Sequence, residues 1–424
     1  MLTEQTITAE VEAAKAKGGV LRSNPLFRRM WAAQTVSVFG DSITFIAIPT
    51  VAVLTLKASA FTVGALGAVS WAAWPLIGLP VGVWVDRLPR RPLLVSADLV
   101  RLVLIASVPL AWAFGHVAIA QLMVVAALAG ACSVIFDLTF TSAVPDVVQP
   151  AELADANGRL ELSGSTSRLT GPGLAGLLIG AVGAPAALVG DAISFALSAL
   201  FLGTGPMLAR RHEPAPRRPF LRDLREGMTA LREYWQVYRA TFSAAVSNLA
   251  WTMGQGIFFV FAYRSVHLTP TLVGAALTLA SVGNVAGAAA APALSRKLGT
   301  GPALLVSTTF EASAVLLMPL GIFFGVPLLW IALSLGIRSF FGPLWNVTAA
   351  TMRQIIVPGP LQGRVTAAAR TVGMGVTPIG GLLGGAIATL SSPAWALTIS
   401  GIVGACSALP LISRRMLAVR IAPT

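Results

Sequence analysis

Long apolar runs recur from one end of this chain to the other, and no other feature restricts its possible folds so strongly. Each run has about 20 residues, the length that an α-helix needs to cross the hydrocarbon core of a bilayer. The composition agrees, because 55% of the residues are hydrophobic and 11% are charged, whereas soluble domains carry about 25% charged residues. The sequence therefore predicts an all-α integral membrane protein.

Turn residues and charge clusters divide the chain into twelve expected spans. These are 30–56, 61–85, 93–114, 117–144, 158–182, 186–208, 240–263, 271–294, 302–322, 327–352, 363–390 and 393–412. The longest connection, 209–239, separates an N-terminal six-helix half (30–208) from a C-terminal one (240–412), with tails at 1–29 and 413–424. Its second part is amphipathic, which predicts a helix along the inner membrane surface.

The excess of basic residues, a formal net charge of +13, is confined to alternate connections. Five Lys or Arg residues precede the first span, three lie in 86–92 and eight in 209–239, whereas the opposite side holds Lys57 and Arg264. Short basic loops stay in the cytoplasm, so we expect both termini there and attraction to anionic membrane lipid. This distribution argues against nucleic acid as a partner.

The two halves repeat each other in spacing. Gly64 precedes Asp86 by 22 residues, and Gly274 precedes Ser295 by 21. The turn and glycine patterns that follow the fourth and tenth spans also agree. Parallel repeats of this kind are typical of transporters that have a central cavity between their halves, although turn chemistry common to all multi-span proteins is the alternative explanation.

The loop after the second span carries a dense motif. Its residues are Gly82, Asp86, Arg87, Arg90 and Arg91, in the sequence GVWVDRLPRRPLL over 82–94. This loop resembles the signature G-x-x-x-D-R-x-G-R-[RK]-x-x-L of the major facilitator superfamily, with Pro89 in place of the second glycine. We expect a cytoplasmic latch, in which Asp86 faces a helix N-terminus of the other half and the arginines pair with acids such as Asp146. An ordinary positive-inside loop is the alternative.

The fifth span holds a second motif. Gly158, Gly171, Pro172 and Gly176 resemble the G-x8-G-x3-GP-x2-GG pattern of antiporters in this superfamily, with Ser167 and Ala175 replacing two glycines. Small residues allow close helix packing, so generic packing is the alternative. The basic residue that drug:proton antiporters often carry in the fourth span is replaced by Ala126, and proton coupling must therefore use other groups.

Further stretches resemble one branch of the superfamily over nearly the whole chain. They include 27–31 with Gly40-Asp41, 136–146, 156–160, 342–346 and 361–364. This branch holds macrolide-efflux, enterobactin-exporter and related drug:proton antiporter proteins. The resemblance implies the major facilitator fold and export of a small amphipathic substrate from a bacterial cytoplasmic membrane by alternating access. The composition, with Arg far more frequent than Lys, is also typical of a GC-rich bacterial genome.

Ionisable side chains at membrane depth indicate function, because each costs about 2.5–3.5 kcal/mol on insertion scales. Asp41 lies 12 residues after Arg29, about 18 Å along the helix and near the bilayer centre. Our hypothesis assigns proton coupling to Asp41 first and Asp137 second, with Arg338 as the counter-charge. A structural hydrogen-bonding role for Asp41 is the alternative.

Polar and aromatic residues at helical spacing mark the expected cavity on the first, fourth, seventh and tenth spans of the family fold. They are Gln34, Asn248, Trp251, Gln255, Trp330, Ser334, Phe341 and Trp345. The aromatic residues are consistent with an amphipathic cargo, and Arg338 leaves room for an anionic one.

Other buried charges have simpler expected roles. Asp98 and Arg101 are neighbours at i, i+3 and neutralise each other. Glu311 is expected in a structural ion pair, and Asp191 at a helix N-terminus near the outer surface.

The competing functions belong to different classes. A siderophore exporter and a lipid or lysophospholipid flippase use the same fold. An ATP-driven pump needs the loop G-x-x-x-x-G-K-[ST], which the sequence lacks, and an enzyme or metal centre disagrees with three scattered histidines and two isolated cysteines. A passive channel disagrees with the repeat and the latch. We therefore expect a non-enzymatic, monomeric antiporter with no cofactor, driven by the proton gradient.

Overall fold

The computed structural model describes residues 19–204 and 220–420, except for the side chains at 79–80, 83, 86–87, 220–224 and 360. The described chain is helical and contains no strand. The outermost parts of the two expected tails and the first part of the 209–239 connection lie outside the described residues.

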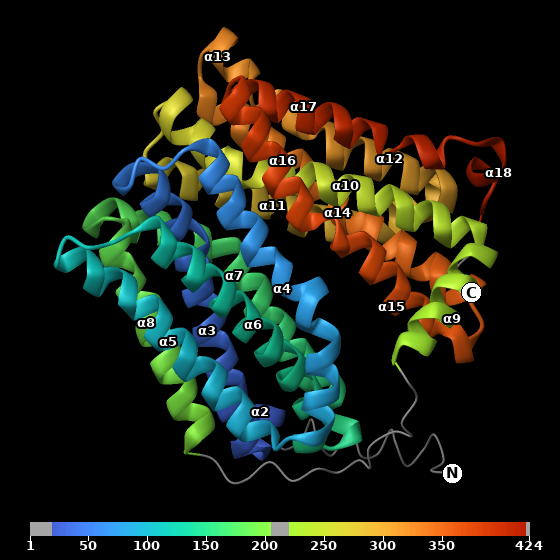
Figure 1. The fold of residues 1–424 in the computed structure, drawn as a ribbon. Coiled ribbons are helices and arrows are strands. Elements are labelled where there is room, and N and C mark those ends of the chain that lie inside the picture. Colours follow the sequence, from blue (N-terminus) through green and yellow to red (C-terminus); the bar gives the residue numbers. More distant parts are fainter. Residues whose placement is uncertain (1–18, 205–219, 421–424) are drawn as a thin grey trace. The chain divides into compact units, whose positions relative to one another are not determined.

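The helices follow one another with short connections (Figure 1). The first group comprises α2 (Val20–Ser23), α3 (Pro25–Thr50), η1 (Val51–Thr55), α4 (Ala60–Arg87), α5 (Arg90–Ala113), α6 (Ile119–Val147), η2 (Pro150–Glu152), α7 (Leu153–Val182) and α8 (Ala184–Gly203). The second comprises α9 (Phe220–Glu233), α10 (Trp235–Val260), η3 (Phe261–Ser265), α11 (Pro270–Leu298), α12 (Thr300–Ser313), η4 (Ala314–Leu317), α13 (Leu320–Phe324), α14 (Pro327–Ile356), α15 (Gly359–Gly375), α16 (Thr377–Leu390), α17 (Pro393–Cys406), η5 (Leu409–Leu411) and α18 (Arg414–Leu417).

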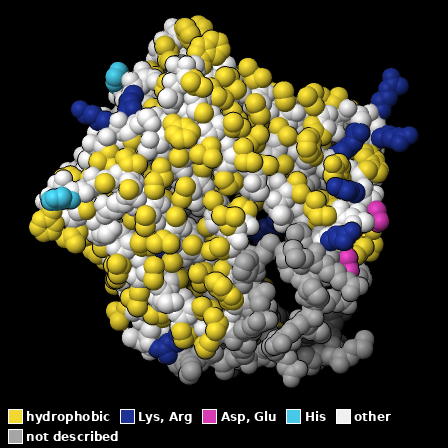
Figure 2. All heavy atoms as spheres, in the orientation of Figure 1, with side chains coloured by type: hydrophobic (Ala, Val, Ile, Leu, Met, Phe, Trp, Pro, Cys, Tyr) yellow, Lys and Arg dark blue, Asp and Glu magenta, His cyan; other side chains and the backbone are white. Residues whose placement is uncertain are grey.

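Eleven helical segments of the described chain are long and apolar enough to cross a membrane. They coincide with eleven of the twelve expected spans. The expected fifth span corresponds to α7, which has 30 residues but carries four charged residues between positions 155 and 168, namely Asp155, Arg159, Glu161 and Arg168. The predicted arrangement of twelve transmembrane helices is therefore confirmed. Figure 2 shows many hydrophobic side chains on the described part of the face in view.

The backbone repeats between the halves at one unusual place. Two five-residue π-helices, η1 and η3, end the first and seventh spans, 210 residues apart. Each is followed by a non-glycine residue with positive φ, Lys57 at 50° and His267 at 52°. Such backbone conformations are rare in residues other than glycine. Lys57 and His267 are 210 residues apart, and Gly64 and Gly274 have the same separation. This agreement supports an internal repeat.

The described helices pack into two compact units, and two of the boundaries between the units fall inside spans, within α3 and within α4. Among the described residues, unit 1 comprises 19–48 and 76–204, and unit 2 comprises 49–75 and 220–420. The first part of α4 belongs to unit 2 because it packs closely on α16, where a Cβ atom at Gly64 would meet the backbone of Gly381 and Gly385. The expected half of 30–208 therefore contains a segment, 49–75, that packs with the other half.

The amphipathic helix α9 is part of the core of unit 2. Its Ala230 and Leu231 are buried in an apolar cluster with Met352, and Glu226 forms an ion pair of 2.8 Å with Arg364 on α15. The sequence analysis predicted this helix along the inner membrane surface, and in the structure its apolar side covers other helices of unit 2.

Candidate functional site

Unit 1 holds a cluster of ionisable side chains around one buried arginine. Arg101, on α5, forms an ion pair with Asp98 three residues earlier and lies 3.9 Å from the carboxylate of Asp41 on α3. Asp98 and Arg101 are buried, whereas 46% of the Asp41 side chain is exposed. Of these two acids, Asp41 is thus the one whose carboxylate is not enclosed by the protein.

Neighbouring helices fix the position of Arg101. Its guanidinium lies over the rings of Phe136 on α6 and Phe195 on α8, at 4.7 and 4.3 Å from their centroids. The Ser198 hydroxyl donates a hydrogen bond of 2.6 Å to Asp98. Aromatic faces attract a cation, so the arginine is held by packing as well as by charge.

Two further aspartates adjoin this group. Asp191, on α8, accepts hydrogen bonds from Thr44 and, at 2.9 Å, from Ser194. Asp137, on α6, is exposed and directly follows Phe136, whose ring lies against the Arg101 guanidinium. We call Asp41, Asp98, Arg101, Asp137 and Asp191 the acidic cluster; it contains four carboxyl groups and one guanidinium.

The position of Asp191 corrects one expectation. The sequence analysis placed it at a helix N-terminus near the surface, but α8 begins at Ala184 and Asp191 lies two turns inside it, fully buried. Close packing against α3 explains this burial, because a Cβ atom at Gly40 would collide with Asp191 and Ser194.

Arg338 is placed in unit 2, beside a different acid. Its guanidinium lies 3.3 Å from the carboxylate of Glu311 on α12 and 3.8 Å from the ring centroid of Trp251 on α10. Glu311 thus takes the expected structural pairing. Within the described residues, the cation that contacts Asp41 is Arg101, a role that the sequence analysis assigned to Arg338.

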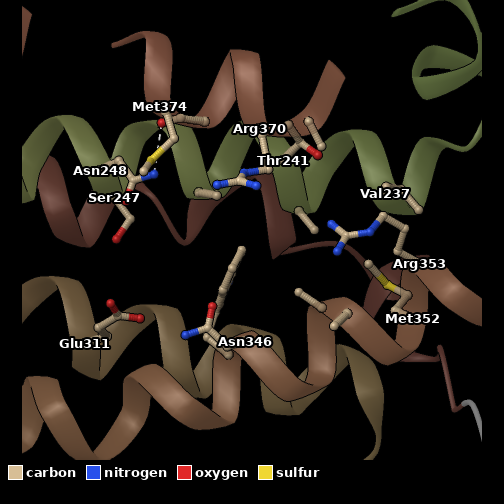
Figure 3. Close-up of a pocket in the computed structure, with 17 residues that line it drawn as sticks. Val237, Thr241, Ser247, Asn248, Glu311, Asn346, Met352, Arg353, Arg370 and Met374 are labelled. Atoms are coloured by element: carbon tan, nitrogen blue, oxygen red, sulfur yellow. Dashed lines mark hydrogen bonds between the residues drawn. The ribbon is translucent and has the colours of Figure 1, made fainter. Parts of the chain in front are cut away.

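Unit 2 contains a cavity of about 540 Å³ between α10, α12, α14 and α15 (Figure 3). Its lining is Val237, Ala240, Thr241, Ala244, Ser247, Asn248, Glu311, Trp345, Asn346, Ala349, Ala350, Met352, Arg353, Ala369, Arg370, Gly373 and Met374. The volume is typical of small-molecule sites. Asn248 is held in position by a 2.9 Å hydrogen bond from its amide nitrogen to the Gly373 carbonyl.

The residues expected to line a cavity divide into two groups. Asn248 and Trp345 line the cavity of unit 2. The others do not line this cavity. In unit 2, Gln255 accepts a 2.9 Å hydrogen bond from Trp71, Trp251 lies against the Arg338 guanidinium, Trp330 packs beside Phe324, Phe341 stacks on Phe310 and Ser334 is buried. Gln34 lies on α3 of unit 1, and its buried Oε1 has no partner in the described chain.

Sequence reasoning missed the two arginines of the cavity. Arg353 was counted among loop charges, and Arg370 was not singled out. Both project into the cavity in Figure 3, Arg353 from α14 and Arg370 from α15. The signal available was that Arg370 falls inside an expected span.

The expected latch is described in part. Arg90 forms an ion pair with the buried Asp146, and the Arg91 Nε atom donates a 3.1 Å hydrogen bond to the Leu202 carbonyl. Gly82 has open space around its Cα. The side chains of Asp86 and Arg87 lie outside the described residues.

The glycine motif of α7 contacts α3 at one place. A Cβ atom at Gly171, which precedes Pro172, would collide with Ser42, and Ser167 donates a 2.9 Å hydrogen bond to the Val38 carbonyl. Gly176 is buried, whereas Gly158 is exposed with open space around it. The C-terminal part of the motif is therefore a close-packing surface.

Several solved structures share this fold. A nucleoside transporter, NupG, superposes with a TM-score of 0.76 at 11% identity, covering 93% of this chain and 100% of that chain. A bacterial homologue of the iron transporter ferroportin in the inward-facing state gives 0.74 at 15% identity, with coverage of 93% and 99%. A bacterial homologue of the human lysosomal transporter Spinster gives 0.69 at 13% identity, with coverage of 96% and 99%.

Sequence comparison identifies the family. No curated protein matches the chain significantly, but the family model described as transmembrane secretion effector matches residues 21–421. The chain therefore belongs to the transmembrane secretion effector family and is a membrane transporter of the major facilitator type.

Proposed function

We propose that this protein is a proton-coupled antiporter that exports small amphipathic molecules by alternating access. The observation that carries the proposal is the acidic cluster of unit 1, in which the half-exposed Asp41 faces a buried Arg101 that already has a partner in Asp98. Four carboxyl groups around one guanidinium leave an excess of negative charge in a medium of low dielectric constant, where such charge is costly.

Protonation of Asp41 would relieve that excess. A proton on its carboxyl group removes one negative charge and weakens its attraction to Arg101, while Asp98 keeps the arginine neutralised. The two protonation states of Asp41 thus favour different arrangements of α3 and α5, and a proton can bias a conformational equilibrium by this difference. Asp137, which is exposed beside Asp41, is the second candidate for the proton.

The charge pattern of the loops supports an orientation. Basic connections on one side of the spans predict that both termini face the cytoplasm, in the cytoplasmic membrane of a bacterium. We propose a monomer without a cofactor, driven by the proton gradient. A siderophore exporter and a lysophospholipid flippase remain the alternatives on this fold.

Proton movement in reconstituted vesicles tests the proposal. Acid-loaded proteoliposomes with a trapped pH dye receive lipophilic, macrolide-like or siderophore-like compounds, and we expect at least one class to raise the internal pH. Asp41→Asn should abolish this response, because the amide cannot carry a proton. The matched control is Asp155→Asn on α7, whose carboxylate is 40% exposed and accepts a hydrogen bond from the Val20 amide, a role that an amide oxygen can fill.

Two results would contradict the proposal. One is a response of Asp41→Asn equal to that of the wild type, which would remove Asp41 from coupling. The other is that the folded wild type gives no pH response to any compound but moves a fluorescent lysophospholipid across the bilayer, which would favour the flippase.

A further inference from the structure

Two cavity arginines of unit 2 have no acidic partner within the part of the chain that the structure describes. Arg353 and Arg370 line the cavity from α14 and α15, and neither forms an ion pair or a side-chain hydrogen bond within the described residues. Arg370 lies 5.4 Å from the ring centroid of Trp74. Both guanidinium groups lie in the same cavity (Figure 3).

The acid in the cavity does not neutralise these arginines. Glu311 is the one acidic residue among the described residues that line the cavity, and its partner is Arg338. Arg338 and Arg353 are 15 residues apart on α14, which is about 22 Å along the helix axis. Figure 3 shows Glu311 near one end of the cavity in that view and Arg353 near the other. One end of the cavity therefore carries an excess of positive charge.

The remaining lining suits a molecule with polar and apolar parts. Asn346 and Thr241 add an amide and a hydroxyl, and Trp345, Met352 and Met374 add apolar surface. Methionine and tryptophan adapt to apolar ligands of different shapes. Guanidinium groups bind carboxylate, sulfonate and phosphate oxygens with charge-assisted hydrogen bonds, often two at once.

We propose that this cavity binds an amphipathic molecule through an anionic group held by Arg353 and Arg370, with its apolar part against Trp345 and Met374. This names the substrate class of the exporter proposed above and rests on that proposal. The anionic group comes either from a soluble organic acid or from the headgroup of an acidic lysophospholipid, because both present the same oxygens. Binding itself requires no proton gradient, so it is measurable apart from transport.

Three probes with one ring system isolate the effect of charge. The purified full-length protein in a non-ionic detergent is titrated with radiolabelled 2-naphthoate in a scintillation proximity assay, and neutral 2-naphthamide and cationic 2-naphthylmethylammonium are the competitors. We expect 2-naphthoate to bind at least tenfold more tightly than the amide, a difference of about 1.4 kcal/mol, and the cation to compete least.

Substitution of the arginines should remove this preference. Arg353→Gln and Arg370→Gln are each expected to weaken 2-naphthoate binding about tenfold and to leave 2-naphthamide affinity within about twofold, because one charge-assisted contact is lost. Arg353→Lys and Arg370→Lys should recover part of the loss. The matched control is Arg415→Gln, an exposed arginine of α18 outside the cavity, and thermal unfolding confirms that each variant is folded.

Either of two results would overturn this inference. The first is that 2-naphthoate binds the wild type no more tightly than 2-naphthamide, and the second is that the glutamine variants keep the preference for the anion. If lysophosphatidylglycerol but not lysophosphatidylcholine displaces 2-naphthoate, the anion site is supported, and its anionic group comes from a lipid headgroup. If neither lysolipid displaces 2-naphthoate, the anion site is supported, and its anionic group comes from a soluble organic acid.

Binding and proton movement are separate measurements on the wild-type protein, and together they separate this inference from the proposed function. Intact, arginine-dependent binding without coupled proton movement would overturn the antiport proposal alone. Intact proton coupling without arginine-dependent binding would overturn this inference alone.

Discussion

Arg101 carries the charge balance of the buried part of unit 1. Its guanidinium neutralises the fully buried Asp98, contacts the half-exposed Asp41 and lies over two aromatic rings. A buried ion pair is costly to break, because the remaining partner stays uncompensated. The stability of unit 1 and the proton response proposed for Asp41 therefore depend on the same residue.

This dependence predicts a non-additive pair of substitutions. Arg101→Gln and Asp98→Asn should each destabilise the protein by about 3–5 kcal/mol, whereas the double variant should recover most of that loss, because both charges are gone. Thermal unfolding in detergent measures the three variants. Additive losses in the double variant would show that the two side chains do not depend on each other.

The sequence predicted some of these residues and not their partners. Asp41 stood out because a carboxylate near the centre of an apolar span is rare, and its depth followed from the distance to Arg29. Asp98 and Arg101 were interpreted as a local pair, because an i, i+3 spacing is visible in a sequence. The contact from Arg101 to Asp41 is tertiary, and it depends on how α3 and α5 pack, which no local spacing shows.

At the scale of elements, α14 shows what a helical stripe can and cannot predict. Trp330, Phe341 and Trp345 share a face by their spacing, and the sequence analysis assigned all three to a cavity. The first two pack against Phe324 and Phe310, and Trp345 lines the cavity. A periodic pattern fixes which residues share a face, whereas the neighbouring helix decides which part of that face is covered.

The crossing of α4 and α16 depends on glycine and gives a second prediction. A Cβ atom at Gly64 would meet backbone atoms of α16, whereas one at Gly67, nearly a turn later, would meet nothing within 4 Å. Gly64→Ala should therefore destabilise the protein by about 1–3 kcal/mol through overpacking. Gly67→Ala is the matched control and should be neutral or slightly stabilising, because alanine favours helix.

Thermal unfolding of the two alanine variants checks this prediction. Equal unfolding temperatures would show that α4 and α16 do not approach as closely as the structure indicates.

At the scale of the whole molecule, hydropathy was sufficient to predict where the spans lie. It was insufficient to predict how the spans divide into two units. The lipid requires apolar runs of fixed length, so the sequence alone located the spans to within a few residues. Residues 49–75 group with unit 2 because small residues of α4, α10 and α16 pack together, and this packing leaves no break in hydropathy. Arg353 was likewise missed, because a cation near a span end is also what topology requires. Arg370 lies inside an expected span, and this position was the signal that could have identified it.

Gradient-driven accumulation is the measurement that tests the central claim, proton-coupled export through Asp41, most directly. Proteoliposomes with an acidic interior receive a radiolabelled form of the compound that moves the most protons, and its internal concentration is followed with and without a protonophore. We predict that the wild type accumulates it above equilibrium only with the gradient, and that Asp41→Asn exchanges labelled for unlabelled compound without accumulating it. Two results would contradict the account. One is that Asp41→Asn accumulates the compound to the wild-type level, and the other is that accumulation by the wild type is unchanged when the protonophore is added.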